Sequence, residues 1–122
     1  MENETNITAA TLVDDAPLAI LYFSQPNCSI CLADKPRIQH LAQMYGIPFD
    51  SINSLEKPAI AAHFSVMTVP VVLLIAKGKE VHREARIIDF GRLDRQMQRY
   101  QAAVDSNEEP LSYASLFDQL AE

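Results

Sequence analysis

Two cysteines separated by two residues are the side chains of this sequence best suited to chemistry. Cys28 and Cys31 are the only cysteines among the 122 residues, and they lie in the segment PNCSIC at 26–31. Two thiols at this spacing can close a disulfide with each other. One of them can also attack a foreign disulfide while the other resolves the mixed product. The spacing therefore predicts dithiol exchange.

The cysteines lie where a predicted strand meets a predicted helix. Residues 18–23 form a short, continuous apolar run, which is typical of a buried strand. After the cysteines, apolar residues recur at helical spacing at Ile38, Leu41, Ala42 and Tyr45. Cys28 is thus expected near the N-terminus of a helix, where free N–H groups and the helix dipole favour a thiolate. Cys31 follows one turn later on the same side.

The periodicities of the remaining chain predict the order β-α-β-α-β-β-α. Parallel strands joined by helices come first, and a hairpin completes a mixed four-stranded sheet in an α/β fold. The first long helix contains Pro36 and ends at Gly46, and Asp89 caps the last helix. The expected elements after the first strand are a helix at 29–45, a strand at 47–53, a helix at 57–64, strands at 71–76 and 80–88, and a helix from 90 with the buried stripe Phe90, Leu93, Met97 and Tyr100.

The two ends of the chain are predicted to lie outside this order. A short helix is expected at 8–15. Residues 1–102 are assigned to one domain. Residues 103–122 are assigned to an acidic linker, centred on 104–110, and an appended amphipathic helix at 111–120.

Composition narrows the classes of function. A net charge of −6 argues against nucleic acid or an anionic membrane as the main partner. No stretch approaches the roughly 20 apolar residues of a membrane span, and the acidic start MENET lacks the pattern of a signal peptide. We therefore expect a cytoplasmic protein. In a reducing cytosol a lone CxxC serves catalysis, redox sensing or metal binding.

Metal binding is the less supported of these alternatives. A structural zinc site needs about four ligands, and the CxxC supplies two. The three histidines, His40, His63 and His82, are far apart in sequence and are expected on a helix, at the end of a short helix and on a strand. The sequence therefore predicts no metal site.

Four features in register resemble the thioredoxin family over roughly residues 18–100. A strand runs into a CxxC that opens a helix, and Pro36 occupies the position of the family's helix proline. Val69 and Pro70 stand just before an apolar strand, and Gly78 centres the hairpin turn after it. The resemblance implies a thioredoxin fold and a thiol–disulfide oxidoreductase, with Cys28 as the attacking thiolate and Cys31 as the resolving thiol.

The resemblance also implies how substrates and electrons reach the site. Pro70 would be the family's cis-proline, and the Val69 backbone would hydrogen-bond an extended peptide substrate. Asn27, Val69 and Pro70 are the implied substrate-binding residues. The partners would be protein thiols and disulfides, with a thioredoxin-reductase-like protein as a candidate electron donor. No bound cofactor is needed, because the electrons reside on the two sulfurs.

Several positions depart from the family pattern. Asn27 replaces the tryptophan before the first cysteine, Ser29-Ile30 replaces Gly-Pro, Leu32 replaces a basic residue, Tyr22 replaces the buried acid of the first strand, and Ala85 or Arg86 stands where a glycine is usual. We expect a shifted potential, fewer partners and, because the acid is missing, slower resolution by Cys31. A non-catalytic binding or redox-sensing module remains open as the alternative function.

Overall fold

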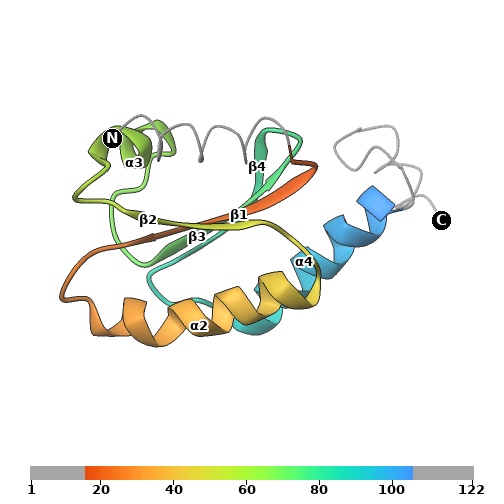
Figure 1. The fold of residues 1–122 in the computed structure, drawn as a ribbon, viewed down its shortest axis with the longest axis horizontal. Coiled ribbons are helices and arrows are strands. Elements are labelled where there is room, and N and C mark those ends of the chain that lie inside the picture. Colours follow the sequence, from red (N-terminus) through yellow and green to blue (C-terminus); the bar gives the residue numbers. More distant parts are fainter. Residues whose placement is uncertain (1–15, 106–122) are drawn as a thin grey trace.

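The computed structural model describes residues 16–105, and its elements follow the predicted order (Figure 1). They are β1 (Leu18–Ser24), α2 (Ser29–Met44), β2 (Phe49–Asn53), α3 (Pro58–His63), β3 (Val71–Ala76), β4 (Lys79–Ala85) and α4 (Phe90–Asp105). The helices expected at 8–15 and 111–120 lie outside the described residues. No helix between residues 16 and 105 has the length and apolar character needed to cross a bilayer.

The strands form one mixed sheet in the order β2-β1-β3-β4. β1 pairs with β2 in parallel, whereas β3 runs antiparallel to β1 and β4 antiparallel to β3. The expectation of parallel strands before the hairpin is therefore right for β1 and β2 and wrong for β3. Ile52 near the end of β2 and Val71 at the start of β3 both pair with Phe23. The connection through α3 therefore returns the chain to the end of the sheet where β2 finishes, and β3 runs the opposite way.

Helices cover both faces of the sheet, as Figure 1 shows: α2 and α4 lie on one face and α3 on the other. Successive residues of β1 and β3 alternate between two buried clusters, and both strands are almost fully buried. This burial on both faces explains why the two strands read as continuous apolar runs rather than as alternating patterns. The central members on the α2 and α4 face are Leu18, Ile20, Tyr22, Val72 and Leu74, and on the α3 face Ala19, Leu21, Phe23, Leu73 and Ile75.

The C-terminus of α2 confirms the predicted glycine cap. Gly46 has a φ of +65°, a left-handed conformation that costs glycine little. Its N–H donates to the Gln43 carbonyl at 3.2 Å, and the Ile47 N–H donates to the Ala42 carbonyl at 2.8 Å. These two bonds make a Schellman motif. The helix continues through Pro36, and because proline has no N–H, the carbonyl four residues earlier loses its helical bond, as expected.

The last helix starts at its predicted cap and ends later than predicted. The Asp89 carboxylate accepts the Arg92 N–H at 2.9 Å, which satisfies one free donor of the first turn. The predicted stripe is confirmed, since Leu93 and Met97 are fully buried and Phe90 and Tyr100 pack against the same core. Val104 continues this stripe onto the core. Residues 103–105, predicted to begin the linker, therefore belong to α4.

A buried acid joins β4 to α4. The Glu84 side chain is 1% exposed and accepts two hydrogen bonds from the Arg92 guanidinium, at 2.6 and 2.8 Å. The Asp89 N–H lies 3.2 Å and the His82 ring nitrogen 2.6 Å from the same carboxylate. The Arg92 bonds first, and then the other two, lower the pKa of Glu84 to about 2. Glu84 is thus an ionised link between the edge strand and the helix.

Candidate active site

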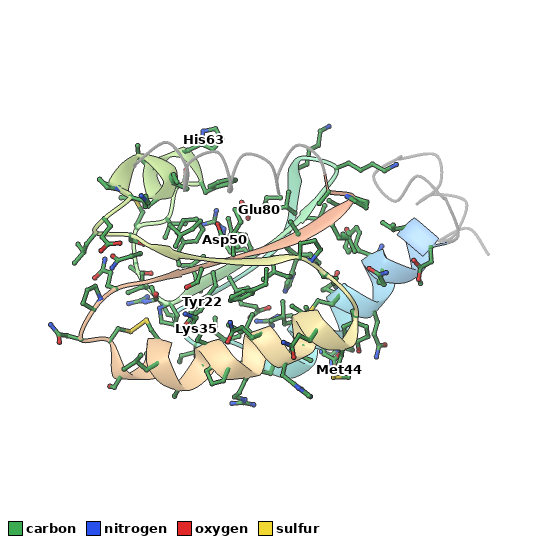
Figure 2. All side chains as sticks on the ribbon, viewed as in Figure 1. Tyr22, Lys35, Met44, Asp50, His63 and Glu80 are labelled. Atoms are coloured by element: carbon green, nitrogen blue, oxygen red, sulfur yellow. A yellow bond between two sulfur atoms is a disulfide. The ribbon has the colours of Figure 1, made fainter. Side chains whose placement is uncertain are left out.

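The two cysteines form a disulfide at the junction predicted for them. Their Cα atoms are 5.2 Å apart, and Figure 2 shows the bond at the start of α2, just beyond the end of β1. The turn between strand and helix contains Asn27 with a φ of +65°. Asparagine tolerates this left-handed conformation better than most residues, which gives Asn27 a clear backbone role. Its side chain is exposed beside the disulfide.

Cys28 occupies the N-cap position of α2. Its backbone is extended, with φ −104° and ψ 99°, and its Sγ accepts the Cys31 N–H at 3.2 Å. The helix itself starts with the Leu32 N–H donating to the Cys28 carbonyl, also at 3.2 Å. An N–H group and the positive end of the helix dipole therefore point at one sulfur. After reduction, this environment stabilises the thiolate of Cys28.

The two sulfurs differ in how far solvent and substrates can reach them. Cys31 is only 2% exposed, whereas Cys28 is partly exposed. A foreign disulfide can therefore approach Cys28 far more easily than Cys31. The structure thus brings the two predicted cysteines together, with Cys28 accessible and Cys31 buried.

Tyr22 anchors the cysteine turn to the sheet. Its side chain is fully buried between β1 and α2, as Figure 2 shows, and its hydroxyl donates to the Cys31 carbonyl at 2.8 Å. Burial, and then the negative charge of Asp34, raise the pKa of Tyr22 to about 12. Tyr22 is therefore a neutral donor near pH 7. At this position the chain has a positioning hydrogen bond in place of an acid.

Removing the Tyr22 hydroxyl should destabilise the oxidised protein. Tyr22→Phe removes a buried hydrogen bond to a carbonyl that keeps its place in the helix, and such a loss costs about 0.5–1.5 kcal/mol. Urea unfolding of the disulfide form measures the change. Tyr100→Phe is the matched control, because no hydrogen bond to the Tyr100 hydroxyl is formed within residues 16–105. Equal free energies of unfolding for the two variants would contradict the anchoring role.

Asp34 is the functional candidate that the sequence reading missed. It is 7% exposed and belongs, with Cys31, Ile38 and Ala42, to the buried stripe of α2. The sequence held one signal. An acid stands three residues after Cys31 and four before Ile38, a helical position where the stripe would otherwise be apolar.

The segment before β3 lies at the same end of the sheet as the cysteines, where β1 finishes. Phe23 pairs with Val71, so Val69 and Pro70 lie beside the end of β1. The Val69–Pro70 peptide bond is cis. The Pro70 carbonyl accepts the Arg86 N–H at 2.8 Å, whereas the backbone of Val69 has no hydrogen-bond partner in the described part of the chain.

Arg86 is one of the two residues, with Ala85, at which the resemblance implies a glycine. Its φ is +69°, a conformation that L-residues other than glycine, asparagine and aspartate seldom adopt. The left-handed residue ends β4 at Ala85, three residues before the predicted end. The backbone at this corner therefore has a conformation that glycine adopts at little cost, although the residue is arginine.

Four exposed apolar side chains are close in sequence to the cysteines, to Pro70 or to Arg86, at the end of the sheet that we call the dithiol edge. We call Ile30, Leu32, Met67 and Ile87 the apolar rim; they are 47%, 74%, 88% and 81% exposed. Ile30 and Leu32 flank Cys31 in sequence, Met67 precedes the cis-proline by three residues, and Ile87 follows Arg86. Such a concentration of exposed apolar side chains is typical of a surface that contacts other molecules.

The histidines lie where the sequence predicted and far from one another. His40 is on α2, His63 ends α3 and His82 is on β4. Figure 2 shows His63 on the face of the sheet opposite α2. Between residues 16 and 105, no three His, Cys, Asp or Glu side chains gather as metal ligands.

Comparisons with known proteins agree with this geometry. A family model described as "TraF: F plasmid transfer operon protein" matches residues 3–93. The thioredoxin-like protein YdfQ of Bacillus subtilis is 33% identical over 94 residues, which cover 76% of this chain and 84% of that protein. The prophage-derived thioredoxin-like protein YosR of the same organism is 31% identical over 67 residues, or 54% of this chain and 79% of that protein.

Solved structures share the fold. Thioredoxin 1 of Thermosipho africanus superposes with a TM-score of 0.67 at 32% identity, covering 71% of this chain and 98% of that one. A thioredoxin of Nicotiana alata gives 0.69 at 22% identity, covering 82% and 87%. The CxxC pair that follows β1, the matching family model and these relatives lead to one conclusion. The chain belongs to the thioredoxin family, as a thioredoxin-like protein.

Proposed function

We propose that this protein is a thiol–disulfide oxidoreductase that exchanges disulfides with protein substrates through Cys28 and Cys31. The observation that carries the proposal is the asymmetry of the pair. One sulfur is accessible and lies at a helix N-terminus with an N–H directed at it, and the other is buried directly behind it.

In the reducing direction, exchange takes two steps. The Cys28 thiolate attacks one sulfur of a substrate disulfide, which forms a mixed disulfide and releases the first substrate thiolate. Cys31, after losing its proton, attacks Cys28 Sγ; the mixed disulfide breaks and the second substrate thiolate leaves. Two electrons pass from the dithiol to the substrate. The reverse sequence oxidises a substrate dithiol.

Substrates are proposed to bind across the dithiol edge as extended segments. The N–H and C=O groups of Val69, which are unpaired within residues 16–105, offer strand-like hydrogen bonds, and Pro70 and Asn27 border the same edge. The apolar rim adds contact area for apolar substrate side chains. This combination favours protein substrates over small thiols, because a small thiol cannot use the rim.

We also propose a protein electron donor and a cytoplasmic setting. Reduction of the Cys28–Cys31 disulfide would come from a thioredoxin-reductase-like protein. A lone CxxC in a reducing compartment would cycle between its two states rather than serve as a permanent crosslink.

Catalysed reduction of a protein disulfide tests the function. The protein should accelerate reduction of insulin by dithiothreitol, whereas Cys28→Ser should give the rate of dithiothreitol alone. If the wild-type protein also gives no acceleration, the enzyme proposal fails. The chain would then be treated as a binding or redox-sensing module.

A further inference from the structure

We propose that Asp34 is the proton acceptor for Cys31 when that thiol resolves the mixed disulfide. This inference rests on the proposed exchange function and assigns one of its steps to a residue. It concerns the buried sulfur, which must become a thiolate before it can attack.

The position of Asp34 supports this role. Asp34 lies one helical turn after Cys31 on the same buried stripe of α2, so their Cβ atoms are roughly 5–6 Å apart. It also lies close enough to Tyr22 for its charge to act on the phenol. Tyr22 in turn holds the Cys31 carbonyl. Asp34 and Cys31 thus share the buried stripe of α2, which lies next to Tyr22 on β1.

Burial creates the need for an internal acceptor. The reactive form of a cysteine is the thiolate, and burial disfavours that charged form. Cys31 is 2% exposed, which limits direct proton transfer to solvent. Tyr22 cannot take the proton, because its neutral hydroxyl already donates to the Cys31 carbonyl.

Other charged groups near this end of α2 are less suitable. Tyr22 pairs with Val72, and Val72 pairs with Glu84, so Glu84 lies two strands away on the same sheet face. Its carboxylate is ion-paired with Arg92. Lys35, the next residue on α2, is a cation and cannot accept a proton while charged. Among residues 16–105, Asp34 is the carboxylate nearest in the helix to Cys31, and it forms no salt bridge there.

The step balances without another reactant. The proton of the Cys31 thiol passes to the Asp34 carboxylate while the Cys31 sulfur forms a bond with Cys28 Sγ. The bond between Cys28 Sγ and the substrate sulfur breaks, and that sulfur leaves with the electron pair. Asp34 then returns the proton to the departing thiolate or to water.

Two-phase kinetics with a small aromatic disulfide separates the two cysteines. When reduced protein is mixed with one equivalent of 5,5′-dithiobis(2-nitrobenzoate), attack by Cys28 releases one coloured thiolate and resolution by Cys31 releases the second. Asp34→Asn should leave the first phase unchanged and slow the second at least about 10-fold near pH 7. In Asp34→Asn, the rate of the second phase should then rise about tenfold per pH unit, because the Cys31 proton must pass to hydroxide.

Controls separate a proton acceptor from a structural acid. Asp34→Leu, which fills the helical stripe with an apolar residue, should slow the second phase equally even if it raises stability. Asp34→Leu also replaces Asp34→Asn as the test variant if Asp34→Asn does not fold. Asp34→Glu should restore most of the rate, and the exposed Glu56→Gln should behave as wild type. A carboxylate that only repelled the Cys31 thiolate would give the opposite sign, a faster second phase on removal.

The outcomes also separate this inference from the proposed function. One contrary result is a second phase whose rate and pH profile are the same in the wild-type protein, Asp34→Asn and Asp34→Leu. That result would overturn the role of Asp34, while the exchange function would stand. If the wild-type protein shows no second phase, the exchange function fails, and the role of Asp34 fails with it.

Discussion

Cys31→Ser should arrest the protein as a mixed disulfide with its substrate, whereas Cys28→Ser should form no such product. The reason is the difference in access between the two sulfurs, since Cys31 is 2% exposed and Cys28 is partly open at the helix N-cap. Without Cys31, the first attack still occurs but nothing resolves it. Both variants should lose catalysed turnover and fall to the uncatalysed rate.

Incubation with an oxidised protein substrate, followed by non-reducing electrophoresis and mass measurement, detects the trapped species. The double variant Cys28→Ser/Cys31→Ser is the control for nonspecific association and should trap nothing. Equal trapping by Cys28→Ser and Cys31→Ser would contradict the assignment of the attacking sulfur to Cys28.

Glu84→Gln should lower the free energy of unfolding by about 2–3 kcal/mol near neutral pH. The Glu84 carboxylate is buried and holds both Arg92 and the first turn of α4. Charge-assisted hydrogen bonds contribute about 1.5–3 kcal/mol each at most. Because Arg92 is half-exposed, its release to water keeps the loss below the roughly 3–5 kcal/mol that breaking a fully buried pair costs.

The effect of Glu84→Gln should depend on pH. The Arg92 bonds hold the pKa of Glu84 at about 2, below its ordinary value of 4.5. A lowered pKa in the folded state contributes stability that is present above the unfolded value and is lost as the pH falls through the folded one. The difference between wild type and variant should therefore be full at pH 7 and shrink as the pH falls from 4.5 towards 2.

Urea unfolding across this pH range measures the difference. Glu80→Gln is the matched control, since Glu80 pairs with Arg83 in a largely exposed contact on the same strand. That change should cost less than about 1 kcal/mol. A cost for Glu84→Gln that is equal at pH 7 and pH 3, or no larger than that of Glu80→Gln, would show that the buried link does not stabilise the fold.

The sequence was sufficient to predict the elements because each carries a local signal. Continuous apolar runs marked β1 and β3, a helical apolar stripe marked α2, and Gly46 and Asp89 marked helix ends. The antiparallel direction of β3 was not predicted, because it depends on the path of the connection through α3 and no residue of the strand marks it. The extension of α4 to Asp105 includes Val104, which packs against the core; in the sequence, one valine before a polar, acidic segment is hard to distinguish from a linker residue.

The site was predicted in part. The cysteine pair was evident from its spacing, and the structure adds which sulfur is buried. The polar residues within the core were missed, since an apolar periodicity treats Asp34 as an interruption and Glu84 as an edge-strand surface residue. Tyr22, on which the charge of Asp34 acts, and Arg92, which hydrogen-bonds Glu84, lie 12 and 8 residues away in sequence, and only tertiary packing brings them near. The left-handed backbone of Arg86 likewise has no signature in the side chain itself.

The proposed oxidoreductase function depends most directly on a reversible disulfide between Cys28 and Cys31, and an equilibrium redox titration measures it. The protein is equilibrated with glutathione and dithiothreitol buffers of defined potential, and its free thiols are counted by alkylation and mass. We predict a single two-electron transition of the monomeric chain between about −270 and −120 mV, the range of redox-active thioredoxin-fold proteins. Failure to form a reversible intramolecular disulfide at any potential in that range would contradict the oxidoreductase function.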